Sequence, residues 1–196
     1  MKVAIKEIST DEELKTAVEV VGNGLQFIND YLAENPKKVG KIRFPRKFIG
    51  DVSTHNKKYN WIENDTLKRN LSYQYIFYDV LRWIANRTDI YGIAREMLYK
   101  HAIVVVSSIA EGLLAAAAIN LNYKEKKFPT RLEHLLGDGI LDQKLHDGLL
   151  SMWTMRHAIH IHIVDDLEWD KYKADNINDA SEWVRKFENA LREHFV

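Results

Sequence analysis

The 196-residue sequence contains no cysteine. Disulfides, zinc sites built on cysteine and thiol nucleophiles are therefore excluded. Net charge is also absent, because 28 basic residues balance 28 acidic ones. The overall charge thus argues neither for nor against a nucleic-acid partner, and only local charge can do so. Lys6 and Glu7 interrupt the short apolar stretch near the start, so we expect no secretion signal.

The one long apolar run covers residues 102–119, and two serines, Glu111 and Gly112 interrupt its middle. A carboxylate at the centre of a membrane costs about 3 kcal/mol on insertion scales. The run is therefore expected to be the central helix of a bundle rather than a membrane span. We accordingly expect a cytoplasmic protein without a membrane partner.

Helix signals dominate the chain, and 46% hydrophobic residues suffice for a core. Thr10 and Glu13 form a capping box, and Pro36 ends the helix that follows. Along that helix, apolar residues recur at alternating spacings of four and three, which is typical of one apolar helical face. They are Leu14, Val18, Val21, Leu25, Ile28 and Leu32.

Further helices are predicted along the rest of the chain, and the fold class is all-α, a helical bundle. We expect an extension over 1–90 and a bundle over 91–196. Thr130 is expected to cap a short helix that Gly137 ends in a left-handed conformation, and Asp142 a longer helix reaching residue 162. The expected segments are helices from 65 to 85, 88 to 120, 131 to 136, 142 to 162 and 179 to 195, the last with Trp183, Phe187, Ala190 and Leu191 on one face.

Residues 36–60 read as a loop with a local charge of +7, from eight basic residues against Asp51. Phe44, Phe48 and Tyr59 lie among them. Lysine and arginine bind phosphates and aromatic rings stack on bases, so the segment is a candidate RNA-binding surface. The alternative is a solvated loop whose aromatics enter the core. The candidate RNA-binding residues are Lys37, Lys38, Lys41, Arg43, Arg46 and Lys47.

The stretch MRHAIHIH contains Arg156 followed by His157, His160 and His162. His157 and His160 share a helix face as metal ligands do, but Arg156 would place a fixed charge beside the ion and no HExxH motif is present. We therefore expect no metal and no cofactor. A core helix is the second interpretation, although an arginine is almost never buried without a partner, so Arg156 requires an anion.

RNA cleavage without a metal is the third interpretation of this stretch. In that reaction the ribose 2′-OH attacks the adjacent phosphodiester and forms a 2′,3′-cyclic phosphate. A histidine has the near-neutral pKa that general acid–base catalysis needs. A guanidinium group stabilises the charge that develops on the phosphorane. One arginine and one histidine are therefore the minimum set, and the stretch contains both.

Residues 95–195 resemble the HEPN superfamily, all-helical domains of which many are endoribonucleases in toxin, defence and RNA-processing systems. The family's mark is an arginine followed at a spacing of four to six residues by a histidine, here Arg156 and His162 with five residues between them. The helix bearing Glu111 and the polar loop after it also match the family's order. The resemblance implies that Arg156 and His162 are the catalytic pair and that His157 supports them. His160 is the second choice for the acid–base histidine, and Glu111 would orient or neutralise Arg156.

Helical geometry leaves the choice of histidine open. In a straight helix His160 lies about 40° around the axis from Arg156, and His162 about 240°. The family favours His162 at a helix end or bend, in dimers whose two motifs face one cleft. We therefore expect a homodimer that acts on RNA, with an antitoxin protein as a candidate partner. The dimer is also expected from apolar residues on more than one face of helix 142–162: Leu145, Leu149, Leu150, Met152, Trp153, Met155 and Ile159.

Two other functions remain open from the sequence. One is a non-catalytic HEPN-like module that binds RNA, a nucleotide or another protein. The other is a structural helical dimerisation domain. The intact Arg156–His162 pair favours an active ribonuclease over both.

Overall fold

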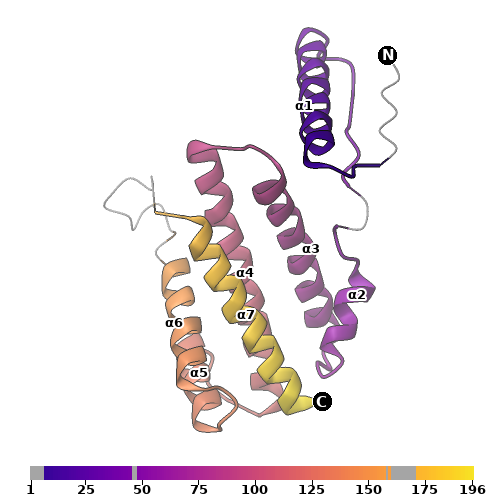
Figure 1. Ribbon diagram of the computed structural model, residues 1–196. Helices are drawn as coiled ribbons and strands as arrows, with labels where there is room; N and C mark the ends of the chain where they lie inside the picture. The colour runs from indigo at the N-terminus through magenta and orange to yellow at the C-terminus, as the bar shows by residue number, and fades with distance from the viewer. Residues whose placement is uncertain (1–6, 46–47, 158, 160–170) are drawn as a thin grey trace. The chain divides into compact units, whose positions relative to one another are not determined.

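A computed structural model of the chain describes residues 7–45, 48–157, 159 and 171–196. Within these residues the secondary structure consists of α-helices and one 3-10 turn, without strands, which confirms the all-α class (Figure 1). The elements are α1 (Asp11–Glu34), α2 (Val52–Asn56), the 3-10 turn η1 (Lys57–Tyr59), α3 (Asp65–Arg87), α4 (Gly92–Asn120), α5 (Phe128–Gly137), α6 (Gln143–His157) and α7 (Ala174–Phe195).

The chain divides into two compact units, Met1–Pro45 and Arg46–Val196. The boundary therefore lies at residue 45 rather than at residue 90, where the sequence placed it. The reason is that α3 packs along α4 and contributes Leu71 and Leu81 to the same core. The first unit holds α1 and the segment after it, and the second holds the bundle.

The bundle is arranged around α4, which contacts α3, α5, α6 and α7. Figure 1 shows α3 and α2 on one side of the α4–α7 pair, and α5 and α6 on the other. α4 is long and apolar enough to cross a membrane, and 67% of its apolar 18-residue window is buried within the structure. The apolar run thus forms the centre of the bundle, as the sequence predicts.

Two glycines set how closely neighbouring helices pack. A Cβ at Gly148 of α6 would lie 2.4 Å from the indole ring of Trp183 on α7. A Cβ at Gly112 of α4 would lie 2.7 Å from Cδ2 of Leu71 on α3. Contacts this short do not occur between real side chains, so both helix pairs require glycine at the crossing.

The helix ends confirm two of the predicted capping residues. Thr10 and Glu13 form the capping box of α1, with the Glu13 N–H donating to the Thr10 hydroxyl at 3.2 Å and the Thr10 N–H donating to the Glu13 carboxylate at 3.0 Å. Asp142 accepts a hydrogen bond from the Leu145 N–H at 2.7 Å and so begins α6. α1 ends at Glu34, two residues before Pro36, as expected from the proline.

The predicted ends of α5 are wrong. α5 begins at Phe128, because Pro129 fits the first helical turn, and Thr130 lies inside the helix. Gly137 is helical, and Gly139 adopts the left-handed conformation at φ +72°. The Ile140 N–H donates to the Leu135 carbonyl at 2.9 Å and the Gly139 N–H to that of Leu136 at 3.0 Å, which is the Schellman pattern.

The structure also corrects the segments around the bundle. Residues 36–60 are not all loop, since Asp51 caps α2 with a hydrogen bond from the Thr54 N–H at 2.6 Å. α7 begins at Ala174 instead of residue 179, because the Asn176 side chain accepts a hydrogen bond from the Lys173 N–H at 2.8 Å. Its predicted inner face is confirmed, with Phe187 and Leu191 fully buried.

Candidate functional site

The structure brings Arg156 and Glu111 together, although 45 residues separate them in sequence. Arg156 is the penultimate residue of α6, and Glu111 lies in the middle of α4. The Arg156 Nη1 donates a hydrogen bond to Glu111 Oε1, which forms an ion pair. The two side chains are 30% and 32% exposed. The guanidinium is therefore held by one carboxylate while part of it remains accessible at the surface.

α6 ends within the motif. The sequence predicted a helix as far as residue 162, but the helix ends at His157. The Ile159 N–H donates to the carbonyl of Arg156 at 3.2 Å, three residues back instead of four. This bond replaces the α-helical pattern with a tight turn. His160 and His162 lie outside the described residues.

A stack of rings supports the end of α6. Phe128 of α5 stacks on Trp153 of α6, with ring centroids 5.7 Å apart and planes 1° apart. His157 lies over the same indole at 3.9 Å, tilted by 40°. Ile159 packs against the core just beyond the helix end. These contacts hold His157 beside Arg156 from one side of the bundle.

The apolar residues of α6 that led us to expect a dimer are covered within the chain. Leu145, Leu149 and Met152 are buried in the bundle core. Leu150, Trp153 and Met155 pack against that core and are partly buried. This face of α6 is therefore occupied by α4, α5 and α7 of the same chain.

The basic segment 36–60 does not form one continuous element. Its first part, up to Pro45, belongs to the unit that contains α1, and Lys57 and Lys58 lie on η1 in the bundle unit. Tyr59 is fully buried, so one of the aromatics enters the core, as the alternative interpretation expects. Lys37, Lys38, Lys41 and Arg43 are exposed, whereas Arg46 and Lys47 lie outside the described residues.

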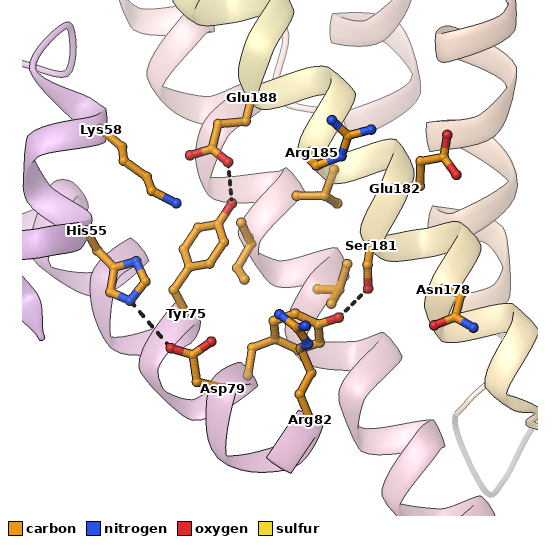
Figure 2. Close-up of a pocket in the computed structure, with 14 residues that line it drawn as sticks. His55, Lys58, Tyr75, Asp79, Arg82, Asn178, Ser181, Glu182, Arg185 and Glu188 are labelled. Atoms are coloured by element: carbon orange, nitrogen blue, oxygen red, sulfur yellow. Dashed lines mark hydrogen bonds and ion pairs between the residues drawn. The ribbon is translucent and has the colours of Figure 1, made fainter. Parts of the chain in front are cut away.

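A cavity of about 580 Å³ lies on the other side of the bundle, between α2, α3 and α7 (Figure 2). Sequence reasoning did not identify it. His55 is 6% exposed and stacks on Tyr75 with ring centroids 5.3 Å apart. Neither ring nitrogen of His55 has a hydrogen-bond partner among the described residues. The nearest carboxylate is that of Asp79, with Oδ2 at 3.8 Å from Nε2.

The local backbone positions His55 and Asp79. The Gly50 N–H donates to Asp79 Oδ2 at 3.0 Å, and a Cβ on Gly50 would lie 2.5 Å from the His55 ring. Only glycine fits there. Burial lowers the pKa of His55, the first cause being desolvation, so the ring favours its neutral form.

Two tyrosines connect α3 to α7 across the cavity. The Tyr75 hydroxyl donates to Glu188 Oε2 at 3.2 Å, and the Tyr78 hydroxyl bonds to that of Ser181. Burial, followed by the nearby Glu188 charge, raises the pKa of Tyr75, so its hydroxyl stays protonated. Side chains rather than close backbone packing thus bridge these two helices.

Three cations surround this cavity. Lys58, Arg82 and Arg185 are exposed, line it from three different elements, and form no ion pair within the described ranges. Lys58 Nζ lies 5.7 Å from the Tyr75 ring centroid, and the Arg82 guanidinium 5.7 Å from that of Tyr78. The sequence signal for this cavity is the recurrence of polar residues at helical spacing along α3 and along α7. That signal could not show that the two faces meet.

Among the described residues, no cluster of three or more histidine, cysteine, aspartate or glutamate side chains could hold a metal ion. No family model, curated protein or solved structure matches this chain. The Arg156–Glu111 pair and the cavity are therefore the two features of the structure that bear on function.

Proposed function

We propose that the protein is a metal-independent endoribonuclease of the HEPN type that acts as a homodimer. The observation that carries the proposal is the position of Arg156, at the end of α6 and held by Glu111 of α4. In the reaction, a histidine takes the proton of the ribose 2′-OH as the oxygen attacks phosphorus. A second proton transfer releases the 5′-oxygen as a hydroxyl, and a 2′,3′-cyclic phosphate remains.

Each residue of the motif has a defined part in this proposal. Arg156 stabilises the charge on the phosphorane through its planar, two-pronged guanidinium. His162 is the acid–base group, His157 supports it, and His160 contributes mainly to packing. The end of α6 at His157 and the turn at Ile159 support this assignment, because the resemblance places the catalytic histidine at a helix end or bend.

The test is cleavage of mixed cellular RNA in EDTA. We expect activity to survive the chelator, since imidazole and guanidinium suffice for the reaction. His162→Ala and Arg156→Lys should each reduce the rate by about 10²–10⁴, while His160→Ala costs less than about tenfold. His101→Ala is the matched control, because this exposed histidine bonds only to the Met97 carbonyl of its own helix. If all variants cleave like wild type, the ribonuclease proposal is wrong.

Glu111 is a positioning residue in this scheme, because it contacts the catalytic arginine and not the substrate. Glu111→Gln keeps the shape and a hydrogen-bond acceptor but removes the charge. It should lower the cleavage rate less than Arg156→Lys and leave the free energy of unfolding within about 1 kcal/mol, as for a partly exposed ion pair. A large loss of stability with unchanged cleavage would assign the pair a structural role only.

The cavity between α2, α3 and α7 supports a second candidate function, the binding of a small anionic ligand. Lys58, Arg82 and Arg185 would bind a phosphate or carboxylate, and His55 offers an unsatisfied ring nitrogen. Calorimetric titration with inorganic phosphate and with a nucleoside monophosphate tests it. Arg82→Gln with Arg185→Gln should abolish binding, whereas Arg87→Gln, an exposed arginine at the end of α3, should not.

A further inference from the structure

α1 presents an apolar face that residues 7–45 leave largely uncovered. The apolar stripe of α1 consists of Leu14, Val18, Val21, Leu25, Ile28 and Leu32. The first five of these side chains are between 40% and 62% exposed, and Ala17 is the one buried residue of the helix. A helix in water gains most of its stability from packing of such a face. The stripe therefore requires a partner surface of about its own length.

The spacing of the stripe is that of a coiled coil. The stripe residues, Leu14 to Leu32, alternate by four and three, which is the heptad period of an a/d seam. The positions that flank such a seam normally carry charged residues, and these determine which helices pair and in which orientation. Here they carry a single charge, and the flanking residues are Lys15, Ala17, Gly22, Gly24, Asn29 and Tyr31.

We propose that α1 pairs with α1 of a second copy of this chain, in antiparallel orientation. About a two-fold axis near residue 23, the seam is chemically symmetric. Leu14 faces Leu32 of the second copy, Val18 faces its Ile28 and Val21 faces its Leu25. Gly22 and Gly24 flank the axis, and a Cβ at either would have nothing within 4 Å. The two backbones can therefore approach closely at the midpoint of the pair.

The charges of α1 and of the segment after it favour an antiparallel pair over a parallel one. α1 has six acidic residues and one lysine, a net charge of −5, and three of the acids lie in its first turn. Residues 36–45, directly after α1, carry four basic residues and no acidic one. An antiparallel pair places the acidic first turn of one copy near Lys37 and Lys38 of the other. A parallel pair would bring the two acidic turns together.

Charge also decides against a membrane surface as the occupant. An interfacial helix carries lysine and arginine on its polar face to bind anionic lipids. The polar face of α1 is acidic instead. Within residues 7–45, Gly40 lies against the end of the stripe, where a Cβ on it would be 3.5 Å from Leu32 Cδ1 and 3.8 Å from Ile28 Cγ2.

Sedimentation of the full-length protein tests this interface. Wild type should be a dimer at micromolar concentration, and Val21→Glu with Leu25→Glu should be a monomer. The control is Asn23→Glu, which adds a charge to the same turn on the opposite side of the helix. A wild-type monomer, or a dimer that survives both seam charges, would overturn the proposal.

Cross-linking gives a second measurement that does not depend on the stability of the charged variant. Because the chain has no cysteine, single cysteines report on contacts without background. A mixture of Val18→Cys and Ile28→Cys proteins should form mixed disulfide dimers under mild oxidation, and neither protein alone should do so efficiently. Phe27→Cys, off the seam, is the control. Efficient self-linking of Val18→Cys would indicate a parallel pair and contradict the proposed orientation.

The interface does not depend on the ribonuclease proposal, and the two can fail separately. Val21→Glu with Leu25→Glu changes no residue of the Arg156–His162 motif. If this variant is monomeric and still cleaves RNA, the α1 pair holds and the site is complete in one copy. If it remains dimeric and cleaves RNA, the ribonuclease stands and the α1 interface is wrong.

Discussion

α1 and α4 are both long helices rich in apolar residues, yet they differ in burial. In α4, thirteen of 29 residues are buried, whereas α1 has one buried residue among 24. The apolar residues of α4 surround the helix and those of α1 form a stripe, so only α4 can pack against neighbours on all sides. The comparison shows that apolar content predicts a need for partners but not whether the same chain supplies them.

The largest expected difference between the two regions is the effect of removing a leucine side chain. Leu113 of α4 is fully buried, and Leu113→Ala should lower the free energy of unfolding by about 2–5 kcal/mol, because it leaves a cavity. Leu25 of α1 is 40% exposed, and Leu25→Ala should change the unfolding of the bundle by less than about 0.5 kcal/mol. Urea denaturation measures both. Equal losses would mean that α1 is part of the bundle's cooperative unit.

Replacement of one glycine by alanine in each region should change stability in opposite directions. Gly148→Ala should destabilise the bundle by about 1–3 kcal/mol, since the added methyl group overlaps the Trp183 ring. Gly22→Ala meets open space within its own chain, and in a protein that Val21→Glu with Leu25→Glu keeps monomeric it should stabilise the helical form of α1 by about 1 kcal/mol. Thermal unfolding followed by circular dichroism distinguishes the two. A stabilised Gly148→Ala protein would show that α6 and α7 are less closely packed than described.

The smallest expected effects are two titrations in different pH ranges. The pKa of His55 is below its usual 6.5, so the unfolded chain binds the proton more readily, and the bundle should lose stability as the pH falls from about 7. The pKa of Glu13 is below 4.5, because the Ser9 and Thr10 N–H groups donate to it, so α1 should lose its cap only below about pH 4.5.

Denaturation between pH 7 and 5 measures the first titration, with His55→Gln as the control that should flatten the profile. Helicity between pH 5 and 3 measures the second, with Glu13→Gln as its control. An unchanged slope in His55→Gln would assign the pH dependence to another of the eight histidines.

Local patterns predicted the fold class well. The capping box at Thr10, the cap at Asp142 and the inner face of α7 all depend on residues within a few positions of one another, so they could be recognised in the sequence. The start of α5 was wrong because Pro129 outweighed Thr130 as a start signal. The end of α6 was wrong because nothing in the local sequence marks the turn at Ile159.

The candidate site was predictable in part for the same reason. The meeting of Arg156 with Glu111 was expected from the resemblance, whereas the residues alone indicate only that Arg156 requires an anion. The cavity around His55 could not be anticipated, because its lining combines residues as distant as His55 and Glu188. Such a combination depends on how α2, α3 and α7 pack.

The sequence by itself determined that this protein is helical, where α1, α3 and α6 begin, and that Arg156 needs an anion. These properties follow from backbone hydrogen bonding and from the period of apolar residues, which act over a few positions. Only the tertiary structure decided that α3 joins the bundle, that the apolar face of α6 is covered within the chain, and that residues 7–45 leave most of the α1 stripe uncovered. Those outcomes depend on which surfaces meet, and burial is a property of pairs of surfaces rather than of any one segment.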